Sequence, residues 1–118
     1  MADIVVTAAY ASVVEDEGQL FIGFAEGEAE DEGYVLFRQA DAGGPVWFEV
    51  TDEAFGADDA VEAVLAGPEG LAITIRADRI AAFGWAGSVM VKIAANAEGR
   101  DAAFAALEAM LGPVWRTA

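Results

Sequence analysis

Carboxylates are the most abundant side chains in this chain that could do chemistry. The 118 residues include 21 Asp and Glu, six Lys and Arg, no His and no Cys. A glycosidase uses two such carboxyl groups, held at a fixed separation in a cleft where one of them has a raised pKa. Most of the carboxylates here fall in predicted turns, where water surrounds them instead of a desolvating cleft. We therefore do not expect a catalytic carboxylate pair.

One acidic segment, Glu28-x-Glu30-x-Glu32-Gly33, imitates the first half of a calcium-binding loop. That loop requires Asp at its first position and Glu at its twelfth, whereas this chain has Glu28 and Gln39 there. A strand is predicted to follow, where the calcium motif has a helix. We expect no dedicated metal site, and the lack of Cys and His excludes a disulfide and the usual zinc sites.

Activated nucleophiles are also missing. Ser12 and Ser88 both lie in predicted strands, and no His is present to act as their general base. Lys92, the one Lys, alternates with apolar residues on a predicted strand and should point to solvent or toward acidic surface. Gly43-Gly44 lies in a predicted hairpin and not before a helix, so it does not form a phosphate loop. The sequence predicts a protein that is not an enzyme and needs no cofactor.

A predicted hairpin brings together one pair of opposite charges. If its turn is centred between Gly43 and Gly44, Arg38 and Glu49 lie directly opposite each other on one face of the sheet. They would then form either a structural ion pair on the outer face or part of a partner-binding face. Trp47, on the same predicted face, is either a partner anchor or is covered by the helix or a neighbouring strand.

Charge is distributed very unevenly along the chain. Residues 1–62 hold sixteen acidic residues and one basic residue, so that the whole formal charge of −15 lies there. Residues 63–118 hold five acidic and five basic residues. Such a negative surface repels nucleic acid and anionic membranes and attracts a basic protein partner. The residues that we expect to meet this partner are Glu28, Glu30, Asp31, Glu32, Arg38, Trp47, Glu49, Asp52 and Glu53.

Alternating apolar residues separated by turn sequences predict an antiparallel sheet of about six to seven strands. The predicted strands are residues 3–14, 19–25, 34–39, 46–51, 71–76 and 88–94. Residues 60–66 suit either a strand or a short helix, and we favour a strand. Residues 26–33 and 52–59 are too charged to pack and are predicted as solvated connections, while residues 78–84 form a predicted short helical turn.

The apolar spacing changes at residues 97–111, where it becomes the three- and four-residue spacing of an amphipathic helix. Asn96 is the expected N-cap, and Gly112-Pro113 is a stop signal. The predicted fold class is therefore α+β, in one domain over residues 1–118. It combines a curved antiparallel sheet with one C-terminal helix packed on a face.

The N-terminal sequence lacks the basic segment and apolar stretch of a signal peptide. No stretch approaches the roughly 18 consecutive apolar residues of a membrane-spanning helix. We therefore expect a soluble, cytoplasmic protein, and its oligomeric state stays open.

The order of these segments resembles a known family. The motifs are Tyr34-Val-Leu-Phe-Arg38, Val46-Trp-Phe-Glu-Val50 and Leu71-Ala-Ile-Thr-Ile75, followed by a short helical turn, a strand and a final helix. This order is similar to immunity-protein family ten of bacterial polymorphic toxin systems, over roughly residues 19–112. In that family a strand ending in Arg precedes a strand in which two aromatic or aliphatic residues come before a Glu. The matching positions here are Arg38 and Glu49.

The resemblance also implies a function. Proteins of that family are thought to bind a cognate toxin domain and block it, and many such domains are nucleases with basic substrate-binding surfaces. An acidic inhibitor can occupy such a surface and is attracted to it at long range. We therefore expect an immunity protein that binds and neutralises a basic toxin domain without catalysis. The alternative is a small acidic structural or regulatory protein-binding module whose partner is unknown.

Overall fold

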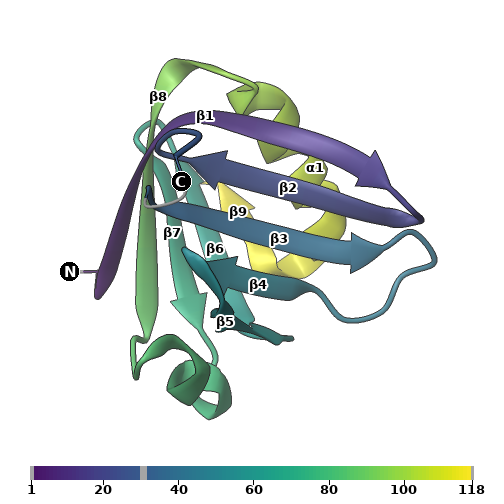
Figure 1. Ribbon diagram of the computed structural model, residues 1–118, viewed down its shortest axis with the longest axis vertical. Helices are drawn as coiled ribbons and strands as arrows, with labels where there is room; N and C mark the ends of the chain where they lie inside the picture. Colours follow the sequence, from purple (N-terminus) through teal and green to yellow (C-terminus); the bar gives the residue numbers. More distant parts are fainter. Residues whose placement is uncertain (1, 30–31, 118) are drawn as a thin grey trace.

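A computed structural model describes residues 2–29 and 32–117 (Figure 1). The strands form one sheet in the spatial order β5-β4-β3-β2-β1-β8-β7-β6-β9. Their bounds are β1 (Ile4–Asp16), β2 (Gln19–Ala25), β3 (Tyr34–Ala40), β4 (Trp47–Val50), β5 (Asp52–Asp58), β6 (Val61–Gly67), β7 (Gly70–Ile75), β8 (Ser88–Glu98) and β9 (Trp115–Thr117). The helices are the α-helix α1 (Arg100–Leu111) and the 3₁₀ helices η1 (Ala77–Phe83) and η2 (Gly112–Val114).

Strand β1 belongs to both halves of the sheet. Its residues 4–8 pair in parallel with β8, and its residues 10–16 pair antiparallel with β2. The register shifts between the pair Ala8–Ile93 and the pair Tyr10–Glu98, so the extra residues of this bulge lie in β8. Figure 1 shows the result: β1 bends strongly, so that β2, β3 and β4 run across the direction of β7 and β8. The sheet therefore folds over on itself and encloses the core between its two halves.

The core is built from the inward side chains of both halves. Phe24, Phe37, Phe48 and Phe83 are each at most 1% exposed. The ring centroids of Phe37 and Phe48 lie 4.8 Å apart, and those of Phe48 and Phe83 lie 5.6 Å apart, so that β3, β4 and η1 pack together. Strands β7 and β8 and helix α1 complete the core with Leu71, Ile73, Val89, Val91, Ala103, Leu107 and Leu111. Helix α1 packs on β1, β2 and β8.

The predicted fold class is confirmed, but the predicted sheet is only partly right. The chain is α+β with a C-terminal helix, and residues 60–66 form strand β6 as favoured. The sheet has nine strands, not six or seven, and it is mixed, because β1 is parallel to β8 and β6 is parallel to β9. Alternation within a strand predicts the strand but carries no information on which strand lies beside it.

Two local predictions are wrong, and one strand was not predicted. Residues 52–59 are predicted as a solvated connection but contain strand β5, an edge strand whose exposed acidic side chains hide its pattern. Strand β9, which follows the helix, is too short for any periodicity to appear. Asn96 lies within β8, and the residue that precedes α1 is Gly99, whose φ of 78° is left-handed.

Two glycines with the same backbone conformation have very different surroundings. Gly18, with φ 79°, lies in the turn between β1 and β2, and a Cβ there would meet no atom within 4 Å. Gly99, with φ 78°, joins β8 to α1, and a Cβ there would lie 2.0 Å from the backbone oxygen of Ala11. The start of α1 can therefore approach β1 this closely only with glycine at position 99.

We predict that Gly99→Ala lowers the free energy of unfolding much more than Gly18→Ala does. Each substitution places a Cβ in the left-handed region, which costs about 1 kcal/mol. Gly99→Ala adds a backbone clash that only a shift of α1 or β1 relieves, so we expect it to cost a further ~2 kcal/mol or more. Urea unfolding of both variants measures the difference. Equal losses in the two variants would contradict the close approach of α1 to β1.

Candidate protein-binding surface

Four side chains lie together on the outer face of β3 and β4. They are Tyr34, Arg38, Trp47 and Glu49, and we call them the Glu49 cluster. Glu49 is only 6% exposed. Its carboxylate oxygens accept hydrogen bonds from the Tyr34 hydroxyl and from Trp47 Nε1, the latter at 2.7 Å. The guanidinium carbon of Arg38 lies 5.2 Å from the centre of the Trp47 ring, within the range of a cation–π contact. The Tyr34 hydroxyl and the Trp47 N–H, both uncharged, therefore hold this carboxylate, and the Trp47 ring shields it.

A glycine in the edge strand makes room for this arrangement. Gly56 in β5 pairs with Glu49 in β4. A Cβ on Gly56 would lie 2.4 Å from the Cζ2 atom of Trp47 and 2.9 Å from the Cβ of Glu49. The Trp47 ring can therefore extend over β5 at this point and shield the carboxylate from water. Of the two roles open to Trp47, the structure favours cover by a neighbouring strand, because the ring is half-buried against β5.

The predicted opposition of Arg38 and Glu49 is wrong by two residues. Arg38 pairs with Trp47, and Leu36 pairs with Glu49. The predicted register assumed a turn centred between Gly43 and Gly44, whereas the observed pairing is centred one residue earlier, between Ala42 and Gly43, where Gly43 N–H donates to the backbone oxygen of Ala40. Arg38 and Glu49 still share the outer face, yet within the described residues Arg38 contacts the Trp47 ring and forms no ion pair with Glu49.

The surroundings of Tyr34 make its hydroxyl a very weak acid. Burial raises the pKa of Tyr34 well above its ordinary value of 10, and the hydrogen bond to Glu49 adds to this shift. The negative charges of Glu49, Asp52 and Glu53 raise the pKa further, because they disfavour a tyrosinate beside them. Tyr34 therefore remains a hydrogen-bond donor to Glu49 at any physiological pH.

The acidic connection between β2 and β3 is tied to the sheet by Glu26. Its Oε1 accepts a hydrogen bond from the backbone N–H of Gly33 at 3.0 Å, and its Oε2 accepts one from Thr7 in β1 at 3.1 Å. These bonds, with that from Gly33 the stronger, lower the pKa of the Glu26 carboxyl group below its ordinary value. Glu28 is exposed and Glu32 is half-buried, whereas Glu30 and Asp31 lie outside the described residues.

The structure brings part of the predicted binding set together. The C-terminal end of β2, the N-terminal end of β3 and the turn from β4 to β5 lie at the same end of the sheet. This places Glu28, Glu32, Asp52 and Glu53 around that end, while Arg38 and Trp47 lie toward the opposite end of β3 and β4. Within the described residues, no three or more His, Cys, Asp or Glu side chains are grouped to hold a metal ion.

Two exposed aromatic residues are absent from the predicted binding set. Trp85, in the turn between η1 and β8, is 74% exposed, and Phe55 in β5 is 45% exposed. Trp85 also has a left-handed backbone, with φ 69°, which costs a residue with a side chain about 1–2 kcal/mol. The two glycines of Gly84-Trp-Ala-Gly87 indicate a turn here. They give no indication that Trp85 is exposed, because a segment without periodicity does not show which side chains are buried.

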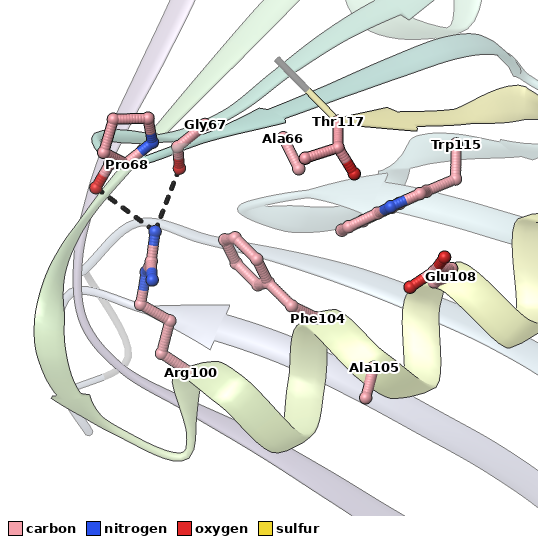
Figure 2. A pocket seen from close by; sticks show the side chains of 9 residues that line it. All are labelled: Ala66, Gly67, Pro68, Arg100, Phe104, Ala105, Glu108, Trp115 and Thr117. Carbon is pink, nitrogen blue, oxygen red and sulfur yellow. Dashed lines mark hydrogen bonds between the residues drawn. The ribbon is translucent and has the colours of Figure 1, made fainter.

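A groove of about 430 Å³ lies between α1 and strands β6 and β9 (Figure 2). At one end the buried Arg100 donates from Nη2 to the backbone oxygens of Gly67, at 2.9 Å, and Pro68, at 3.2 Å. Its guanidinium carbon lies 4.4 Å from the centre of the Phe104 ring, and the ring centroids of Phe104 and Trp115 are 5.7 Å apart. Arg100, Phe104 and Trp115, which we call the Arg100 cluster, therefore join the helix to β6 and β9 through successive side-chain contacts, with the Trp115 and Phe104 rings edge to face.

Two donors beside this groove have no hydrogen-bond partner among the described residues. They are Arg100 Nε and Trp115 Nε1, and both are enclosed by protein atoms. The side chains of both residues pack on Phe104. A molecule in the groove could not reach either buried donor without moving the Arg100 cluster, so we assign this cluster a structural role.

Comparisons with protein-family models, with curated proteins and with solved structures find no match to this chain. The similarity to immunity proteins therefore rests on the short motifs quoted above. In the part of the chain that the structure describes, no helix is both long enough and apolar enough to cross a membrane.

We predict that the stabilising effect of the Tyr34 hydroxyl is lost at alkaline pH. Because the pKa of Tyr34 is higher in the folded chain than in the unfolded one, the unfolded chain alone loses this proton as the pH rises past 10. Tyr34→Phe should lower the free energy of unfolding by about 1 kcal/mol at neutral pH and by progressively less above that point. Urea unfolding of both proteins across this pH range measures the change.

The ultraviolet absorbance of tyrosinate gives a second readout. The difference spectrum between the wild type and Tyr34→Phe should show no tyrosinate until the pH is well above 10. In a Glu49→Gln background the same difference should appear at lower pH, because one cause of the shift has been removed. Ionisation of Tyr34 in the wild type near pH 10, the ordinary pKa of tyrosine, would show that the Glu49 cluster is not formed as described.

Proposed function

We propose that this chain is an immunity-type inhibitor that binds a basic toxin domain stoichiometrically and blocks it without catalysis. The observation that carries the proposal is the segregation of charge in space. Residues 1–62, which hold the formal charge of −15, supply strands β1 to β5, and these five strands are consecutive in the sheet. The acidic half of the sequence is therefore also one side of the sheet.

The negative charge of this half is not neutralised within the protein. The ion pairs among the described residues join Arg76 and Arg79 to Asp78 and Arg100 to Asp101, all of them in the second half of the chain. Arg38, the only basic residue of the first half, lies against the Trp47 ring. Apart from Glu49, which is buried and hydrogen-bonded, the described acidic residues of strands β1 to β5 therefore remain available to a positively charged partner.

Such a surface suits rapid capture of a basic protein. Unpaired charges of one sign attract an oppositely charged partner over distances beyond direct contact and raise the rate of association. A toxin domain that binds nucleic acid presents a basic surface of the required sign. The similarity of the β3 and β4 motifs to those of immunity proteins supports the same function.

Co-expression tests the proposal directly. Each toxin-like protein encoded beside the gene for this chain would be produced with and without it, and both growth and complex formation would be measured. We expect one of these toxins to be neutralised and to co-purify with this chain as a stoichiometric complex. If none of them binds, or if the partner that does bind is acidic, the proposed function is wrong.

We predict that association with the partner slows as salt is added, while dissociation changes less. Exposed charges are screened within about 10 Å at 0.1 M ionic strength. The association rate should therefore fall by about tenfold or more between low and high salt. Stopped-flow mixing measures the rate, and an association rate that is unchanged by salt would exclude electrostatic attraction.

Two triple variants with the same change in net charge locate the attraction. Glu28→Gln, Asp52→Asn and Glu53→Gln together remove three exposed charges from the acidic half, and we expect slower association. The matched control replaces the exposed Glu69, Glu98 and Glu108 of the other half with Gln. If both variants slow association equally, total charge matters and the acidic half is not the binding surface.

A further inference from the structure

The exposed Trp85 has no explanation within the fold. It is 74% exposed, whereas Trp47 and Trp115 are both half-buried and packed on other aromatic or glycine residues. An indole ring is among the largest apolar groups that a protein can bury, and leaving it in water forfeits that gain. Nothing among the described residues covers this ring.

The backbone at Trp85 is also better suited to glycine. Gly84, with φ 65°, and Trp85, with φ 69°, are two successive residues in the left-handed region. Glycine adopts this conformation freely, whereas a residue with a Cβ is strained in it. Both the packing and the backbone therefore favour a smaller residue at position 85. A bulky residue kept in a strained, exposed position indicates a role outside the fold.

A second exposed aromatic residue lies beside this turn. A Cβ on Gly84 would be 3.5 Å from the ring of Phe55, so the Phe55 ring reaches the turn that carries Trp85. Phe55 lies in β5, at the edge of the sheet, where the pairing shifts from Glu49 with Gly56 to Val50 with Asp52. The extra residues form a bulge that includes Phe55. Phe55, Gly84 and Trp85 thus form one surface, which we call the aromatic edge.

Exposed carboxylates surround the aromatic edge. Asp52 and Glu53 precede Phe55 in β5, and Asp58 follows it. On the other side, the carboxylate of Asp3 accepts a hydrogen bond from Gly87, two residues after Trp85, at 2.8 Å. Each of these four acidic residues is exposed.

Two arginines at η1 lie close to this rim, but because they share one aspartate they leave one net positive charge against four carboxylates. Arg76 and Arg79 on η1 both bind Asp78, at 3.2 Å and 3.4 Å, and Arg79 also donates to the backbone oxygen of Asp58. An apolar centre with an acidic rim complements a protein surface that carries Arg or Lys beside apolar groups. An Arg side chain can stack on an indole face while its charge is met by nearby carboxylates.

We propose that the aromatic edge is the anchor through which this chain holds a basic protein partner. The proposal rests on the proposed function for the sign of the partner's charge. The acidic residues speed the encounter, and Trp85 and Phe55 then slow dissociation through close packing. A second copy of this chain does not fit the site, since two surfaces of the same strong charge repel each other.

Stability measurements test the premise without any partner. Trp85→Gly should leave the urea midpoint unchanged or raise it, because it relieves the left-handed strain and removes no packing. The difference in fluorescence quenching between the wild type and Trp85→Gly reports on Trp85 alone. Relative to the quenching of free tryptophan by each ion, caesium should quench this component more than iodide does, because the surrounding carboxylates attract cations. A clearly lower midpoint, or stronger relative quenching by iodide, would overturn the proposal.

Binding measurements test the anchor itself, with the toxin found by co-expression. Trp85→Gly should speed dissociation about tenfold or more and change association little. Phe55→Ala should also speed dissociation. Leu65→Ala is the matched control, because Leu65 is 46% exposed against 45% for Phe55 and lies in the half without net charge. If toxin binds all four proteins alike, the proposed function stands and the anchor is wrong.

A defined probe keeps the anchor testable if no toxin binds. An arginine-rich synthetic peptide would be titrated at high salt, where long-range attraction is screened. The anchor predicts that Trp85→Gly and Phe55→Ala weaken peptide binding several-fold while Leu65→Ala does not. Equal peptide affinity in all three variants would overturn the anchor. Sedimentation that shows self-association lost in Trp85→Gly would also overturn it, by identifying a second copy as the occupant.

Discussion

The bend of strand β1 is the constraint on which the rest of the structure depends. One strand pairs in parallel with β8 and antiparallel with β2, and the two halves of the sheet can enclose a core only because it bends between these pairings. Several other features are attached to it. Thr7 holds the acidic connection through Glu26, the backbone oxygen of Ala11 faces Gly99 at the start of α1, and Asp3, the residue before the strand, accepts a hydrogen bond from Gly87 after Trp85.

The two halves of the sheet differ in their roles. The second half, with α1, contributes ion pairs and the Arg100 cluster, which serve the fold. Among the described residues, the carboxylates of the first half form no ion pair, and most of those in its strands face solvent, whereas Glu49 is covered by Trp47 and bonded by neutral donors. In the proposed function these roles combine: the charge acts at long range, and the aromatic edge acts at contact.

The sequence predicted most elements but few of their contacts. Alternation and β-branched residues located β1 to β4, β7 and β8, residues 60–66 were favoured as a strand over a short helix, and a change of period located α1. Strand β5 was missed because the acidic residues of an exposed edge mimic a loop, and the parallel pairings were missed because neighbours in a sheet are distant in sequence. The offset of Arg38 from Glu49 arose because the turn is centred one residue earlier than its glycines suggested. Exposure of Trp85 depends on tertiary packing, which no local pattern reports.

An open sheet leaves two edges that another polypeptide could extend, here β5 and β9. Strand β9 spans only Trp115–Thr117, and β5 is interrupted by its bulge and lined by Asp52, Glu53 and Asp58. Short, bulged or charged edges are the means by which natural sheets avoid pairing with other sheets and forming aggregates. The acidic residues of β5 therefore have two roles in this account: they attract a basic partner, and they protect the sheet edge from pairing with other strands. A variant that gained affinity for a less basic partner by losing them would also expose a sheet edge to fibril formation.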